Sequence, residues 1–277
     1  MESSSNCIQN NISNPVEIIH LIQQKIVTGR KLDIEENSVL LGGDTNHILI
    51  DRDRVMESAL EEIAAIDDLR ICLEVQFYGE VSVDLGGPRK EFFVLVLNEL
   101  KQKYFDPVRE WSGEYQTIGK IMALSLLQNG KLQRLLSSEL VEEVFSEKEN
   151  CKQFILDSRK GLDALGVYTL ASKLPTLVHV FTPGASTPLS VKKLTNILSP
   201  ILSDNGSNKR RLEAAVYAKF VKYIREVASG HRGDVTLNSI LQFVTGADEE
   251  PILGYQIKPT IHFAYAGVSF SQHQTPV

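Results

Sequence analysis

The sequence predicts an α+β fold, with a larger, mainly helical N-terminal part followed by a smaller α/β part. Apolar residues recur at three- and four-residue spacing over most of the chain, which is typical of amphipathic helices. A few short segments instead alternate apolar and polar residues, as a strand with one solvated face does. A polar run from Ser203 to Asn208 separates residues 209–277 from the rest.

Composition and charge exclude several classes of protein. The chain has 277 residues, of which 43% are hydrophobic and 23% charged, as in ordinary globular proteins. The longest apolar run covers residues 92–97 and is far shorter than the roughly 20 residues of a membrane-spanning helix. The net charge of −6 has the wrong sign for tracking phosphates. We therefore expect neither a membrane nor a nucleic acid as a partner.

The cysteines and histidines indicate neither disulfides nor a metal site. Cys7, Cys72 and Cys151 are an odd, scattered set without CxxC spacing, which is typical of a reducing, intracellular setting. The histidines are too widely spaced for a zinc site, so we expect no metal and no cofactor. A cytoplasmic location follows, with the nucleus as the alternative.

Residues 1–45 are expected to precede the main domain. Residues 1–14 carry too little apolar surface to fold and predict a loose tail. Asn14 can cap a helix that starts at Pro15 and stops before Gly29. Residues 31–45 lose the apolar pattern and predict a linker, so the domain should begin at residue 46.

The next segments predict the first half of the domain. A short apolar stretch at 47–50 precedes a helix over 55–66, and residues 69–77 alternate as a strand that places Cys72 on its solvated face. Gly86, Gly87 and Pro88 turn the chain into a helix. Arg89 and Glu91 at its start either tether it to neighbouring backbone or lie in a solvated turn.

The remaining segments predict helices and one late strand. Residues 119–127 are apolar on nearly all sides and predict a buried helix, and 132–145 predict an amphipathic one. Residues 147–184 are irregular, and further helices are expected over 190–198, 212–227 and 237–244, before a strand over 261–265. The predicted core consists of Val55, Ile63, Leu73, Val75, Phe92, Phe93, Val96, Ile121, Leu124 and Leu127.

Five segments, in order, resemble the HECT family of ubiquitin ligases, and specifically its short vertebrate-type branch. They are DRDRVMESAL, QFYGEVSVDLGGPRKEFF, TIGKIMALSLLQNGKL, ILSDNGSNKRRLEAAVYAKF and LQFVTGADEEPILGYQIKP. The resemblance covers about residues 48–260. It implies a two-lobed domain over 46–277, with an N-terminal lobe at 46–203, a hinge at 204–208 and a C-terminal lobe at 209–277.

The resemblance also implies a function and a set of site residues. A HECT enzyme takes ubiquitin from a conjugating enzyme as a cysteine thioester and passes it to a substrate lysine, so ubiquitin, a conjugating enzyme and a protein substrate are the expected partners. The N-terminal-lobe motif corresponds to Gly86, Gly87, Arg89, Glu91 and Phe92. The C-terminal-lobe motif corresponds to Phe243, Val244, Thr245, Gly246, Pro251 and Gly254.

The chain departs from the family pattern in two places. Only residues 133–177 fill the place of the family's longer insertion that docks the conjugating enzyme. The family's reactive cysteine is the middle residue of a Thr-Cys-Asn segment, which is expected beyond Val277. No catalytic residue is therefore assigned, and the chain as given is expected to be inactive. The alternative is a catalytically inactive HECT-like protein that binds ubiquitin or another partner as a scaffold.

Overall fold

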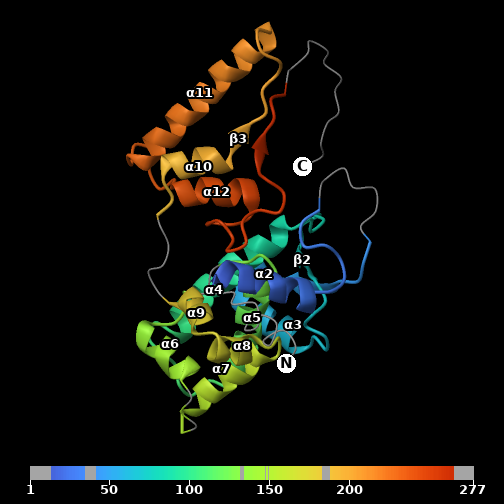
Figure 1. The fold of residues 1–277 in the computed structure, drawn as a ribbon, viewed down its shortest axis with the longest axis vertical. Helices are drawn as coiled ribbons and strands as arrows, with labels where there is room; N and C mark the ends of the chain where they lie inside the picture. Colours follow the sequence, from blue (N-terminus) through green and yellow to red (C-terminus); the bar gives the residue numbers. More distant parts are fainter. Residues whose placement is uncertain are drawn as a thin grey trace. The chain divides into compact units, whose positions relative to one another are not determined.

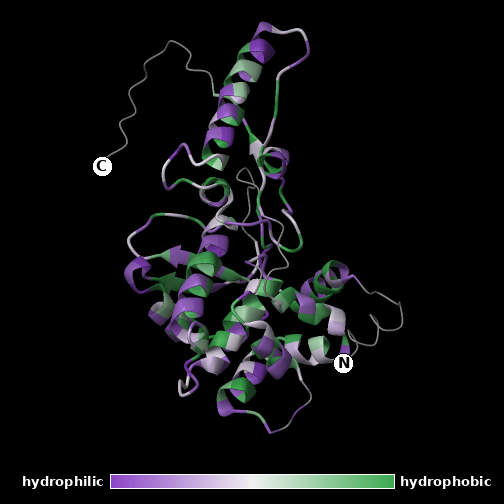
Figure 2. Cartoon of the chain, turned by 90° about the vertical axis from the view of Figure 1, so that its left-hand side faces the viewer, coloured by the Kyte–Doolittle hydropathy of each residue, from purple (hydrophilic) through white to green (hydrophobic). Residues whose placement is uncertain are grey.

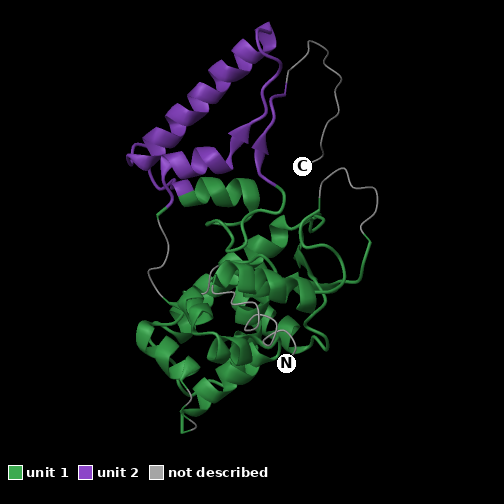
Figure 3. Cartoon of the chain, viewed as in Figure 1, with its two compact units in different colours: residues 1–188, 238–257 green, residues 189–237, 258–277 purple. Residues whose placement is uncertain are grey.

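The computed structural model describes residues 14–34, 42–131, 134–146, 148, 150–182 and 188–264. Two compact units can be distinguished (Figure 3). The N-terminal unit comprises residues 1–188 and 238–257, and the C-terminal unit comprises residues 189–237 and 258–277. Helices dominate both units and the described strands are few and short, which confirms the α+β class.

The N-terminal unit is built mainly of helices (Figure 1). Its helices before residue 128 are α2 (Pro15–Ile26), the 3-10 helix η1 (Arg52–Arg54), α3 (Val55–Ala64), α4 (Gly87–Tyr104) and α5 (Tyr115–Leu127). Its later helices are α6 (Ser138–Phe145), α7 (Gln153–Asp163), α8 (Val167–Lys173), α9 (Pro175–Val178) and the 3-10 helix η2 (His179–Phe181). The segment predicted to be irregular, 147–184, therefore contains several short helices.

The two strands of this unit, β1 (Asn46–Ile50) and β2 (Leu73–Phe77), pair in parallel, with Ile48 opposite Val75. Side chains cap the other edge of β2. The Leu73 N–H donates to Gln128 Oε1 at 2.9 Å, and the Val75 N–H donates to Asp84 Oδ2, also at 2.9 Å. The backbone N–H groups of Leu73 and Val75 at this edge of β2 therefore have hydrogen-bond partners without a third strand.

The prediction for Cys72 was wrong. Alternation placed this residue on a solvated face, but its side chain is buried. The regular strand begins only at Leu73. Before it, the Cys72 N–H donates to the Thr28 carbonyl at 3.0 Å, and Arg89 Nη1 approaches Cys72 Sγ to 3.5 Å. Residues from distant parts of the chain therefore bury Cys72, although the alternation of apolar and polar residues along the strand predicts that it is exposed.

One hydrophobic core fills the N-terminal unit, and all ten predicted core residues are buried. Helix α2, which the sequence interpretation placed ahead of the domain, contributes Ile18, Ile19 and Ile22 to the same core. Helices α5 and α7 approach closely at Gly119 and Gly161. A Cβ on Gly119 would lie 2.9 Å from Gly161 Cα, so glycine at both positions allows this spacing.

The C-terminal unit contains α10 (Val191–Ile197), β3 (Ser199–Pro200), α11 (Asn208–Ala228) and β4 (Thr260–Ile261). The strands pair in parallel, with Ser199 opposite Thr260. Ser207 in the predicted hinge caps α11, because its Oγ accepts from the Arg210 N–H at 3.1 Å. Tyr265, expected at the end of the last strand, lies outside the described residues.

Helix α12 spans Leu237–Thr245. Its first residue, Leu237, is the last of the 189–237 segment of the C-terminal unit, and the rest of the helix belongs to the N-terminal unit. Residues 238–257 thus belong with residues 1–188, although the sequence interpretation assigned them to the second lobe. Within the described residues, no helix combines the length and the apolar character that crossing a membrane requires.

Candidate functional site

A surface groove in the N-terminal unit lies between α12 and the start of α4. Its volume is about 670 Å³. The lining residues come from two segments that are far apart in the chain. They are Gly87, Pro88, Glu91, Ser239, Gln242, Phe243, Val244, Thr245 and Gly246.

The groove depends on a close backbone approach between Gly246 and Gly87. Helix α12 ends where the Gly246 N–H donates to the Gln242 carbonyl at 2.8 Å, and Gly246 then takes a φ of +76°. A Cβ at this position would collide with the Gly87 carbonyl oxygen. Glycine at this position therefore allows both the left-handed backbone conformation and the close contact with Gly87.

Apolar and charged groups lie on different sides of the groove. Phe243 is 91% exposed and Val244 is 46% exposed, which is unusual for large apolar side chains near the end of a helix. Glu91, on the other side, accepts from Arg52 Nη1 at 2.9 Å. Arg52 also pairs with Glu80, lowering the pKa of that carboxyl, and its guanidinium lies 3.8 Å from the centre of the Phe77 ring.

The segment after α12 is held by ion pairs to the rest of the N-terminal unit. Lys131 Nζ lies 2.5 Å from Asp248 Oδ2, and Arg134 Nη1 lies 3.2 Å from Glu249 Oε2. Both pairs are mostly covered from solvent, so they are stronger than fully exposed pairs.

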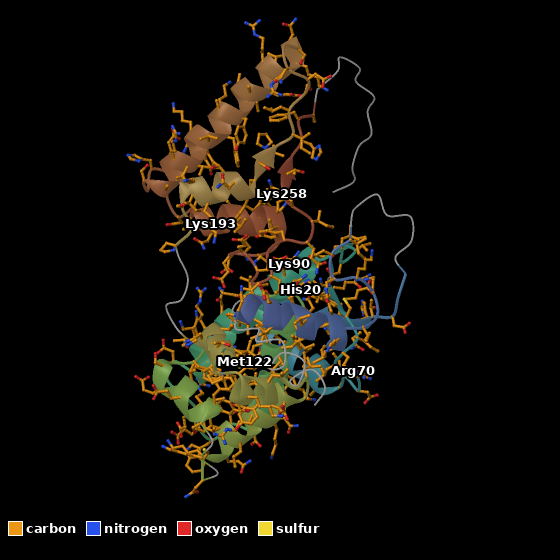
Figure 4. The ribbon with its side chains drawn as sticks, viewed as in Figure 1. His20, Arg70, Lys90, Met122, Lys193 and Lys258 are labelled. Atoms are coloured by element: carbon orange, nitrogen blue, oxygen red, sulfur yellow. The ribbon has the colours of Figure 1, made fainter. Side chains whose placement is uncertain are left out.

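Tyr255 lies farther along the same segment. Its hydroxyl is 3.3 Å from Thr245 Oγ1, and burial raises the pKa of Tyr255 to about 12. Lys90, labelled in Figure 4, lies 5.9 Å from the centre of the Tyr255 ring. These contacts fix the chain that follows Gly246.

Arg89 occupies the centre of a buried polar network at the start of α4. Its guanidinium donates to the backbone carbonyls of Leu32, Leu73 and Gln128, the last two at 3.3 Å. Of the two interpretations of this residue, the tether is therefore confirmed. Asp84 supports the same turn, because its Oδ1 accepts from the Gly86 N–H at 2.8 Å.

Asp33 extends the network into the segment expected to be a linker. Its Oδ1 accepts from Lys90 Nζ at 2.6 Å, and its Oδ2 accepts from Asn129 Nδ2 at 3.1 Å. The Asn129 side chain in turn accepts from Gln23 Nε2 of α2 at 2.8 Å. Residues 23–33 are thus joined to α4 and α5 by buried hydrogen bonds.

The structure brings together only some of the predicted site residues. Gly87 and Glu91 of the first motif and residues 243–246 of the second line the groove. Gly86, Arg89 and Phe92 support the start of α4 from buried positions. Pro251 and Gly254 form a turn in which the Gly254 N–H donates to the Pro251 carbonyl. The predicted site residues did not include Pro88, Ser239 and Gln242, which also line the groove.

The cysteines of the described part of the chain do not resemble nucleophiles. Burial raises the pKa of the Cys72 thiol, which favours the unreactive neutral form. Cys151 is half-buried, and its Sγ donates to the Lys148 carbonyl at 3.0 Å. Cys7 lies outside the described residues. Among those residues, no cluster of histidine, cysteine and acidic side chains could hold a metal ion.

Neither a protein-family model nor a curated protein matches the chain. The residues and their geometry are therefore the basis for assigning a function.

Proposed function

We propose that the chain belongs to a HECT-type ubiquitin-protein transferase, and that the described residues bind and position proteins rather than supply the nucleophile. Such an enzyme accepts ubiquitin from a conjugating enzyme onto a cysteine and passes it to a substrate lysine. The thioester sulfur leaves as the lysine nitrogen attacks the carbonyl carbon, so the cysteine returns unchanged.

One observation carries the proposal. The two HECT-like motifs are separated by most of the chain, yet Gly87 and Glu91 of one and Phe243 to Gly246 of the other line a single groove. An accidental resemblance in either segment gives no reason for the two to meet. The exposed Phe243 also gives the groove an apolar anchor of the kind that protein interfaces use.

A second candidate is a binding protein that forms no thioester. The exposed Phe243 in the groove supports it, because an apolar anchor can bind a protein without any nucleophile. Both candidates predict protein binding at the groove, and they differ in whether any form of the protein carries ubiquitin covalently.

The first experiment tests binding with the 277-residue chain. Labelled ubiquitin and a panel of conjugating enzymes are titrated against the chain and followed by NMR, and Phe243→Ser should weaken the saturable shifts. Leu49→Ser, which alters an exposed apolar side chain on β1, is the control and should leave the shifts unchanged. If the chain binds neither ubiquitin nor any of the conjugating enzymes, the proposal is overturned.

The second experiment separates the two candidates. The chain is incubated with ubiquitin, activating enzyme and conjugating enzymes and run on a non-reducing gel, where no thiol-sensitive band is expected. A version extended by the Thr-Cys-Asn segment of the family should form the band if the lobes are those of a transferase. An extended protein that binds ubiquitin but never forms the band favours the binding protein.

A further inference from the structure

Helix α11 of the C-terminal unit leaves most of its surface open. Of its 21 residues, only Glu213, Ile224 and Val227 are buried. Hydrophilic and hydrophobic residues follow one another along this helix in Figure 2. A helix of this length in a globular protein usually buries a continuous apolar stripe, so the outer face of α11 is available for a partner.

The charge of α11 is opposite to that of the chain. The helix carries six basic residues and two acidic ones, which gives a net charge of +4, whereas the chain as a whole carries −6. Glu213 points inward and accepts from the Ser203 N–H at 2.6 Å. Glu226 pairs with Arg232, their charged atoms 2.5 Å apart, and its other carboxylate oxygen lies 3.9 Å from Lys222 Nζ. The outer face is therefore dominated by cations.

An apolar ridge lies beside these cations. Leu212 is 62% exposed and Val216 is 55% exposed, and their four-residue spacing places them on the same side of the helix. At 100° per residue, Lys219 falls within the same strip, and Lys222 falls on the row beside it. Apolar and cationic side chains thus form one continuous surface.

We propose that this outer face of α11 binds an acidic amphipathic segment of a partner protein. Carboxylates of the segment would pair with Lys219 and Lys222, and an apolar side chain would cover Leu212 and Val216. Charge complementarity selects an acidic partner. The surface shares no residue with the groove, so the inference does not depend on the proposed ubiquitin transfer.

Two other anionic partners fit the surface less well. Binding at a lipid surface needs a broad apolar face with aromatic anchors, and the ridge offers two aliphatic side chains. Single-stranded RNA needs open aromatic rings for base stacking, whereas the Tyr223 ring already has the Arg232 guanidinium 5.0 Å from its centre.

The test is fluorescence anisotropy of the full chain with a labelled helical peptide composed of glutamate and leucine. We expect saturable binding that weakens as salt is raised, because exposed charges are screened. Lys219→Glu with Lys222→Glu should weaken binding about tenfold, since two attractions become repulsions. Leu212→Ala with Val216→Ala should weaken it roughly fivefold through lost apolar contact.

A matched control changes the net charge of the chain equally. Lys101→Glu with Lys173→Glu alters two exposed lysines of the N-terminal unit and should leave binding unchanged. Circular dichroism verifies that each variant is folded. Failure of the peptide to bind at millimolar concentration, or equal weakening by both lysine pairs, would overturn the inference. Tighter binding to phosphatidylserine vesicles or to oligouridine than to the peptide would also overturn it.

Discussion

The backbones of Gly246 and Gly87 lie against each other, and this contact joins the end of α12 to the start of α4. The Gly246 Cα has no room for a side chain, because a Cβ would meet the Gly87 carbonyl oxygen and lie 3.2 Å from the Gly87 Cα. This approach brings together the two segments that line the groove.

Gly246→Ala should therefore destabilise the N-terminal unit by about 2 kcal/mol or more, since the left-handed backbone and the collision both oppose a methyl group. Urea unfolding measures the effect. Gly254→Ala is the matched control, because Gly254 also has a positive φ but open space around its Cα. It should cost only about 1 kcal/mol. Equal losses would show that the Gly87 contact contributes nothing.

The crossing of α5 and α7 supplies a second prediction. In an open helix, alanine is favoured over glycine by about 1 kcal/mol. At Gly161 a Cβ would instead collide with the Gln116 carbonyl oxygen and approach Gly119 Cα to 2.8 Å. Gly161→Ala should thus lower the free energy of unfolding by about 2 kcal/mol, as overpacking does.

The control for this crossing is Gly113→Ala, where nothing lies within 4 Å of the added methyl group. Its midpoint of urea unfolding should match that of the parent chain or exceed it slightly. If Gly161→Ala were as stable as Gly113→Ala, the helices would not be in close contact at this position.

Local sequence patterns predicted the helices and strands better than they predicted which side chains the rest of the chain buries. Phe92 and Phe93 recur at helical spacing with Val96, and this periodicity alone identified them as core. Cys72 shows the limit, because the groups that bury it come from Thr28 and Arg89, outside its strand. Residues 31–34 lack an apolar pattern, yet Asp33 is fixed by hydrogen bonds to distant side chains, which no local rule detects.

The groove itself was not predicted, and the family resemblance supplied only some of its lining residues. That resemblance selected Gly87 and Gly246 without indicating that they touch. Periodicity treats Phe243 as an ordinary apolar residue of a helix, although it is exposed. The exposure of a side chain depends on how distant segments pack around it. A short stretch of sequence does not contain that information.

Arg89 supplies a third prediction. Arg89→Ala removes the guanidinium donor from three buried carbonyl groups and removes the cation that lies 3.9 Å from the Asp84 carboxylate. The loss of stability should be about 3–5 kcal/mol. Arg89→Lys should recover little of it, because an ammonium group cannot reach three separated carbonyls in one plane.

An exposed arginine provides the comparison. Arg70 pairs with Asp68 at 2.6 Å on the surface, and Arg70→Ala should leave the midpoint of urea unfolding nearly unchanged. A loss at Arg89 no larger than that at Arg70 would contradict the central role of the buried network.

The last prediction concerns the dependence of stability on pH. Burial raises the pKa of Cys72 above its value in the unfolded chain, about 8.5. Above that pH the unfolded chain releases the thiol proton while the folded chain keeps it, so the unfolded state gains stability. The contribution of the buried thiol is complete below pH of about 8.5 and is lost as pH rises toward the folded value, at no more than about 1.4 kcal/mol per pH unit.

Urea unfolding between about pH 7.5 and 10 tests this, with Cys72→Ala expected to lose stability less steeply with pH than the parent chain. Leu73→Ala is the matched control, because it also creates a cavity beside β2 but removes no titrating group. It should be less stable throughout and keep the parental slope. Tyr115 and Tyr255, whose pKa values burial raises to about 12, are present in all three proteins and cancel in the comparison. Identical slopes for the parent and Cys72→Ala would mean that the thiol ionises as readily in the folded chain as in the unfolded one, which would contradict the prediction.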